Sequence, residues 1–101
     1  MVAALAAGPL VLVAHHGAAV EAVRGAQVAA MCAACHRLDG RDQGIPSIVG
    51  LEPEVLIDTM AAFRTGGRRP GYIMHAVAIS LSDEEVAAVA EYLATLGNGS
   101  P

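Results

Sequence analysis

The chain has 101 residues, enough for one domain, and 54% of them are apolar although only three are aromatic. Six arginines, no lysine and ten acidic residues give a net charge of −4, which excludes the basic surface of a nucleic-acid-binding protein. About 80 residues remain if an N-terminal segment is removed, and an apolar core of that size is marginal without a cofactor to complete it.

Residues 1–20 are predicted to be an export signal. The first fourteen residues carry no charge and include an apolar run as long as a secretory h-region, which is too short to span a bilayer. No basic residue precedes this run and Gly8-Pro9 interrupts it, so the alternative is a buried N-terminal helix, which glycine and proline disfavour. Small residues place cleavage after Ala19 or Ala22, and the remaining domain is assigned to residues 21–101.

The next segment, residues 21–34, favours a helix that leads into a cysteine motif. Its expected buried stripe comprises Val23, Ala26, Ala30 and Met31.

Cys32, Cys35 and His36 form the sequence C-A-A-C-H, which has the spacing of covalent haem attachment. On the first turn of a helix, positions i and i+3 share a face, so both thiols can reach one edge of a porphyrin. The adjacent imidazole can then bind the iron. The motif therefore predicts one haem c, held covalently, with His36 as an iron ligand.

Three other chemistries fit these residues less well. A thioredoxin-like redox pair belongs to a chain of alternating strands and helices, and no strand-rich segment is present here. A zinc site would need further ligands from His15, His16 or His75, which lie in unsuitable positions. A disulfide between Cys32 and Cys35 would be strained across so short a loop.

The middle of the chain alternates loops with helical segments. Residues 36–51 are rich in glycine, aspartate and proline and predict an extended loop. A proline flanked by two acids at 52–54 begins a second helix, which two glycines end at 66–67. After a second loop over 66–71, the apolar run 73–79 predicts one or two helical turns.

The last helix has the clearest signals. Ser82 and Glu85 form a capping box at its start, and Gly97 is expected to end it, with residues 98–101 fraying. Its expected buried stripe is Val86, Val89, Ala90, Leu93 and Leu96. The predicted fold is therefore small and all-α, with three main helices wrapped around one covalently attached haem.

Taken together, these segments resemble class I cytochromes c. More narrowly, they resemble the monohaem domains of cytochrome c4 and of the cytochrome subunit of flavocytochrome c sulfide dehydrogenase. The resemblance runs from about Val28 to Leu96 and rests on CAACHRLDG (32–40), GIPSIVGL (44–51), MAAFRTGGRR (60–69), YIMHAVA (72–78) and LSDEEVAAVAEYLATL (81–96). Arg37 departs from the small residue usual in these relatives, and Ile79 departs from their glycine.

The resemblance implies two further cofactor-binding residues. Met74 holds the motif position that supplies the distal thioether to the iron, ahead of Met60 and His75 as alternatives. Met60 lies at a stripe position, where a methionine is more often a packing residue. The backbone carbonyl of Pro46 is expected to accept the second ring proton of His36, although this proline could equally be a simple turn residue.

The implied function is one-electron transfer by a periplasmic cytochrome that catalyses no substrate chemistry itself. The implied partner is a redox protein, either the flavoprotein of a sulfide dehydrogenase or a terminal oxidase, and no membrane span is expected in the mature chain. An open-site haem enzyme, such as a peroxidase, is the alternative from a different class, and it requires that Met74 does not bind the iron.

Three arginines lie close to the proposed distal ligand, at positions 64, 68 and 69. They form either a solvated surface that neutralises haem propionates or a docking patch for an acidic partner.

Overall fold

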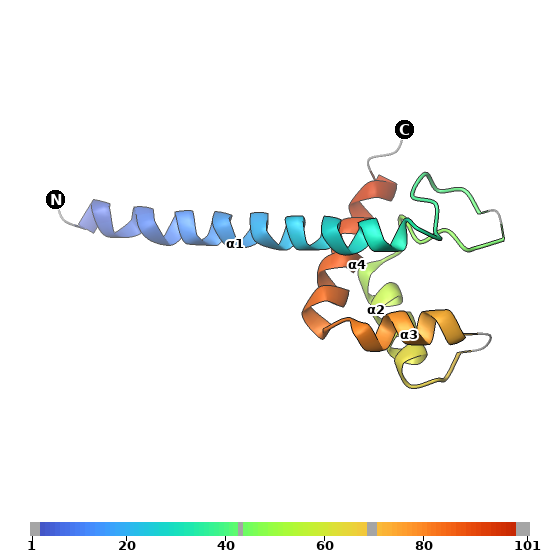
Figure 1. Ribbon diagram of the computed structural model, residues 1–101. Coiled ribbons are helices and arrows are strands. Elements are labelled where there is room, and N and C mark those ends of the chain that lie inside the picture. Colours follow the sequence, from blue (N-terminus) through green and yellow to red (C-terminus); the bar gives the residue numbers. More distant parts are fainter. Residues whose placement is uncertain (1–2, 43, 69–70, 99–101) are drawn as a thin grey trace.

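The structure is a computed structural model that describes residues 3–42, 44–68 and 71–98, with side chains described from residue 17 to residue 97 within those ranges. Over this part of the chain, four helices and no strand are present, which confirms the all-α prediction (Figure 1). The helices are α1 (Ala3–Cys32), α2 (Pro53–Arg64), α3 (Tyr72–Ser80) and α4 (Asp83–Asn98).

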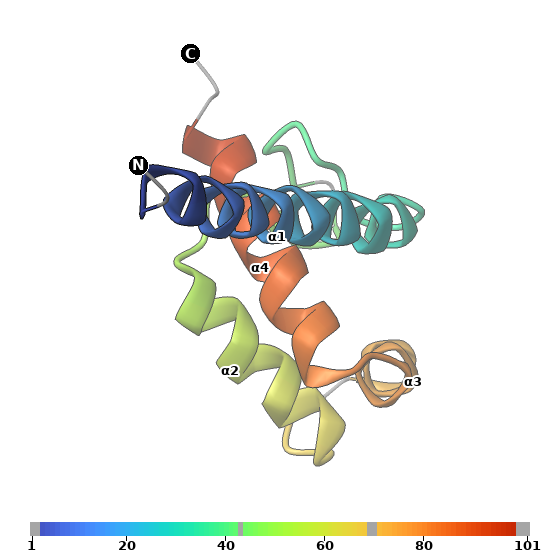
Figure 2. The same cartoon turned by 90° about the vertical axis from the view of Figure 1, so that its left-hand side faces the viewer.

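Helix α4 lies at the centre of the arrangement. It contacts α1 on one side and α2 on another, and α3 packs against α2 (Figure 2). Among the described residues, none of the helices combines the length and the apolar character that crossing a bilayer requires. The buried residues of α1, α2 and α3 form one core cluster with those of α4.

Helix α1 runs unbroken from Ala3 to Cys32, and its first half projects away from the other helices (Figure 1). It passes through Gly8-Pro9, which was expected to interrupt a helix. Proline removes only one backbone hydrogen bond, and the alanine and leucine residues around it have high helix propensity. The assignment of residues 1–20 as an export signal stays a prediction.

The crossing of α1 over α4 is set by Gly25. A Cβ atom at this position would lie 2.5 Å from Ala88 O and 2.8 Å from Tyr92 Cβ, so the two backbones approach closely only because position 25 lacks a side chain. Val28 and Ala29, next along the same side of α1, are buried in the core.

The stripe predicted for this part of α1 is therefore wrong. Val23 and Met31 are 58% and 47% exposed, and Ala30 is also exposed. The segment is rich in alanine and valine on every side, so apolar periodicity cannot choose a face. The buried face of α1 is instead determined by Gly25, the small residue that allows α1 to cross α4 closely.

Helix α2 has the predicted limits. Proline begins it, Glu54 lies in its first turn, and Gly66 follows its end with φ of +78°, a conformation that glycine adopts without strain. Leu56 and Met60 are buried on its inner face. Met60 is therefore a core residue.

Helix α3 is longer than the one or two turns predicted, and it carries no charged residue. Its inner side contributes Met74, Val77 and the buried Ala78 to the core cluster. Its outer side leaves Tyr72 and Ile73 exposed.

Helix α4 confirms the predicted capping box and buried stripe. Ser82 N–H donates to Glu85 Oε1 at 2.9 Å, and Glu85 N–H donates to Ser82 Oγ at 3.1 Å. Val86, Val89, Ala90 and Leu93 are buried and Leu96 packs against them.

The predicted end of α4 is wrong, because the helix continues through Gly97 to Asn98. Gly97 allows a close backbone contact with Gly50: a Cβ atom at position 97 would overlap Gly50 Cα. A glycine that permits such a contact looks, in sequence, the same as one that ends a helix.

Candidate cofactor site

The cysteine motif lies at the end of α1. His36 N–H donates to Cys32 O at 2.9 Å, and Cys35 N–H donates to the same oxygen at 3.1 Å, so the chain completes one more turn beyond the helix. The motif was expected on the first turn of a helix, and it instead begins at the last residue of α1 and continues in the turn beyond it.

The two thiols have different surroundings. Cys32 packs against the core cluster, and burial raises the pKa of its thiol above the ordinary value. Cys35 is exposed, and both cysteines are free. One sulfur is therefore held by the core of the domain and the other faces outward, beside the half-buried His36.

The imidazole of His36 is oriented by a backbone carbonyl. Its Nδ1–H donates to Pro46 O at 2.7 Å. With the proton on Nδ1, the lone pair of Nε2 is available to bind a metal ion. Ligating histidines commonly donate their second ring proton in this way, which fixes the ring and increases its basicity.

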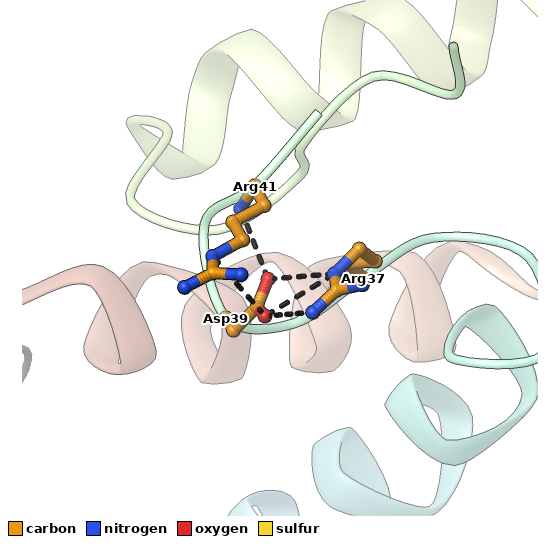
Figure 3. A network of polar contacts seen from close by, with 3 residues as sticks. All are labelled: Arg37, Asp39 and Arg41. Atoms are coloured by element: carbon orange, nitrogen blue, oxygen red, sulfur yellow. Dashed lines mark hydrogen bonds and ion pairs between the residues drawn. The ribbon is translucent and has the colours of Figure 1, made fainter. Parts of the chain in front are cut away.

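The chain between His36 and Pro46 is shaped by a polar network (Figure 3). Both carboxylate oxygens of Asp39 accept hydrogen bonds from the Arg37 guanidinium, and Asp39 Oδ1 also accepts the Arg41 N–H at 3.0 Å. These bonds, first of all that from Arg37, hold the pKa of the Asp39 carboxyl well below its ordinary value. Gly40 turns the chain with φ of +87°.

The apolar surface around this region fits a large flat apolar cofactor. Among the described residues only eleven apolar side chains are buried, four of them alanine. Large apolar side chains remain exposed beside the motif, in the loop that follows it and on α3, namely Met31, Ile45, Leu51, Tyr72, Ile73 and Ile79. A haem bound at the motif would cover part of this apolar surface.

A sequence profile of the cytochrome c family matches residues 22–97, which is most of the chain. The protein belongs to the cytochrome c family. Its cofactor is therefore haem c, attached covalently, and it is an electron-transfer protein that works with a redox partner.

Curated relatives agree with this assignment. The cytochrome is 35% identical to the cytochrome subunit of sulfide dehydrogenase from Chlorobaculum tepidum, over 91% of this chain and 94% of that protein. It is 35% identical to cytochrome c-554(548) of Halomonas halodenitrificans, over 71% of this chain and 92% of that protein.

A third relative is larger than this cytochrome. The thiosulfate dehydrogenase electron acceptor of Stutzerimonas stutzeri is 39% identical over 65% of this chain but only 32% of its own length. No solved structure gives a significant match.

The structure brings four of the five predicted site residues of the cytochrome together, namely Cys32, Cys35, His36 and Pro46. The fifth, Met74, lies half-buried on a separate helix, α3, and packs against the core.

The alternatives to Met74 are engaged elsewhere. Met60 is only 8% exposed within the core. The exposed His75 forms a hydrogen bond through Nδ1 with Phe63 O at 2.7 Å. The side chains of His15 and His16 lie outside the described part of the cytochrome.

The two described arginines of the cluster make separate contacts. Arg64 binds Leu81 O at 3.0 Å, Ala78 O at 3.4 Å and Asp83 Oδ1 at 2.7 Å, so it links the end of α2 to the connection between α3 and α4. Arg68 lies over the ring of Phe63, 5.1 Å from its centroid, and Arg69 lies outside the described residues. Sequence periodicity does not indicate the Arg64 contacts, because they join distant segments.

Proposed function

We propose that this cytochrome is a periplasmic one-electron carrier in which Cys32 and Cys35 tether the haem and His36 and Met74 bind its iron. The hydrogen bond from His36 Nδ1 to Pro46 O carries the proposal, because it prepares the opposite nitrogen for metal binding. When bound, the haem supplies an iron that exchanges one electron between its ferric and ferrous states.

The chain's own residues hold and orient this cofactor. Cys32 and Cys35 would hold the haem by thioether bonds, each from addition of a thiol across one vinyl group, with sulfur bonded to one carbon and hydrogen to the other. Cys32 is anchored in the core, and its position is therefore fixed relative to α4. The carbonyl of Pro46 keeps the proton on Nδ1 of His36 and prevents the ring from turning.

Met74 supplies the sixth ligand in this proposal. A thioether is a soft, neutral donor that would raise the reduction potential relative to a second histidine and would leave the iron closed to small molecules. The burial of Met60 in the core supports Met74 over Met60. The resemblance, in which Met74 holds the thioether position of the motif, supports Met74 over His75.

We further propose that the electron donor is an enzyme that oxidises reduced sulfur compounds. The support is that two relatives are named for such systems, one as a subunit of sulfide dehydrogenase and one as the electron acceptor of thiosulfate dehydrogenase. A single haem takes one electron at a time, so a flavin donor would need two successive transfers for each oxidation. A terminal oxidase is a fitting acceptor, and export through residues 1–20 would place the cytochrome in the periplasm.

Absorption spectra of the haem-loaded protein test the ligand set. In the Met74→Ala variant we expect the ferric protein to lose its sulfur-to-iron band and the ferrous protein to bind carbon monoxide readily. The matched control is Met60→Ala, which should keep the band while losing about 2–5 kcal/mol of unfolding free energy through the cavity it creates.

Two results would contradict the proposal. One is an unmodified protein that already binds carbon monoxide readily, which indicates an open iron site and hence ligand chemistry. The other is a sulfur-to-iron band that survives in Met74→Ala and disappears in Met60→Ala.

A further inference from the structure

The loop that carries the Pro46 carbonyl has its own attachment to α4. Gly50 N–H donates to Leu93 O at 3.1 Å, which joins the end of this loop to the backbone of the central helix. Ile48 and Val49, between the proline and the glycine, pack against the core cluster. The carbonyl that orients His36 therefore lies only four residues from a fixed point on α4.

The fixed point is a contact between two glycine backbones. A Cβ atom at position 97 would lie 2.6 Å from Gly50 N and 3.4 Å from the carbonyl carbon of Val49, and it would overlap Gly50 Cα. Gly50 itself has φ of +75°, where other residues are strained. The last turn of α4 and the loop thus touch without an intervening side chain, and any side chain at position 97 must push the loop away.

We propose that Gly97 is a positioning residue for the iron-binding histidine. Its contact with Gly50 sets the place of residues 46–50 and so the length of the hydrogen bond between Pro46 O and His36 Nδ1. This inference rests on the proposed role of His36 as an iron ligand. In this proposal, the end of α4 controls the basicity of the His36 imidazole, although it is remote in sequence from the motif.

The decisive variant is Gly97→Ala in the haem-loaded protein. Displacement of the loop should lengthen the hydrogen bond, so the imidazole becomes a weaker donor and stabilises the ferric state less. We expect the reduction potential to shift upward and the Nδ1–H proton signal of His36, in nuclear magnetic resonance spectra of the ferrous protein, to shift upfield.

Two variants separate this effect from general loss of packing. Met60→Ala removes a core side chain of α2, remote in sequence from both the motif and the Pro46 loop. It should lower the melting temperature and leave the proton signal of His36 unchanged. Gly67→Ala places its Cβ atom in ordinary contact, 3.5 Å from Ala62 O, and should change none of these quantities.

The outcomes are distinct. A Gly97→Ala protein that melts earlier yet keeps the unmodified potential and proton signal would overturn the inference. An equal shift of the proton signal in Met60→Ala would also overturn it, because the signal would then report softening of the whole domain. Failure of the proposed iron ligand would be visible earlier, since the unmodified protein would lack the spectrum of a histidine-bound iron.

If Gly97→Ala does not retain haem, hydrogen exchange in the unmodified protein decides the matter. Under mildly denaturing conditions, the Gly50 amide and the His36 Nδ1–H should exchange in the same opening event, with the same dependence on denaturant. Exchange of the ring proton through an opening that leaves the Gly50 amide protected would show that the contact does not hold the histidine.

Discussion

Asp39 stabilises the turn after the haem-binding motif through both its charge and its shape. One carboxylate oxygen accepts the Arg41 N–H, as in many turns, and both oxygens bind the Arg37 guanidinium (Figure 3). This ion pair is solvent-exposed, and salt should therefore weaken it.

The Asp39→Asn variant removes the charge and keeps an oxygen for the Arg41 N–H. Because folding lowers the pKa of the Asp39 carboxyl from its ordinary value of 3.8, the ionised group stabilises the fold above that value. This contribution is lost as the pH falls through the lower folded-state pKa. Thermal unfolding should show a lower melting temperature for the variant near neutral pH, and the difference should shrink between about pH 5 and about pH 2.

The same difference should also shrink at high salt near neutral pH. A difference that stays constant across this pH range would mean that the charge of Asp39 adds nothing to stability.

At the scale of the elements, Arg64 connects three segments. It leaves the last turn of α2 and binds two carbonyl oxygens at the corner between α3 and α4, together with Asp83 in the first turn of α4. Arginine suits this role because its planar group offers several donors in a fixed geometry. The sequence left Arg64 either on a solvated surface or in a docking patch, and in the structure its side chain makes contacts within the fold.

The Arg64→Gln variant should lose about 1–2 kcal/mol of unfolding free energy, because carbonyl groups at the corner lose a charged donor. Chemical denaturation of the haem-loaded protein measures this loss. Arg68→Gln is the matched control and should change stability by less than about 1 kcal/mol, since its contact with Phe63 is exposed. Equal losses in the two variants would contradict the role assigned to Arg64.

Local signals predicted most of the helices, and contacts between distant segments account for the errors. The capping box of α4 and the proline of α2 act within one turn, so the sequence shows them directly. The buried face of α1 depends on which residue allows α4 to approach, and the meaning of Gly97 depends on Gly50. Neither relation is encoded in the spacing of neighbouring residues.

The same distinction applies to the candidate site. Cys32, Cys35 and His36 are adjacent in sequence, so their spacing alone predicts their chemistry. Pro46 and Met74 came from a family resemblance, because each lies in a separate segment whose position depends on the fold. The hydrogen bond of His36 with Pro46 O was therefore expected only by analogy, and it is present.

At the scale of the whole molecule, the polypeptide core is small for the length of the chain. Within the described residues Leu93 is the only large side chain that is almost fully buried, at 1% exposure. Helices α1 and α2 pack against α4, and α3 packs against α2. A domain built in this way needs the apolar surface of its cofactor to fold cooperatively.

Removal of the haem tests this dependence. The Cys32→Ala/Cys35→Ala double variant cannot tether a haem, and we expect it to keep part of its helix content while losing a sharp thermal transition. Circular dichroism in the far and near ultraviolet measures the two properties, with the haem-loaded protein as reference. A sharp transition in the double variant would show that the polypeptide core is sufficient alone.

The corner held by Arg64 has a kinetic consequence. The hydrogen bonds of Arg64 fix the end of α3 that leads into α4. Met74 lies less than two helical turns from that end. If Met74 binds the iron as proposed, its sulfur atom is carried on a braced helix end and should move very little when the oxidation state changes. The nuclear reorganisation energy should accordingly be small, which favours rapid electron exchange even when the driving force between donor and acceptor is slight.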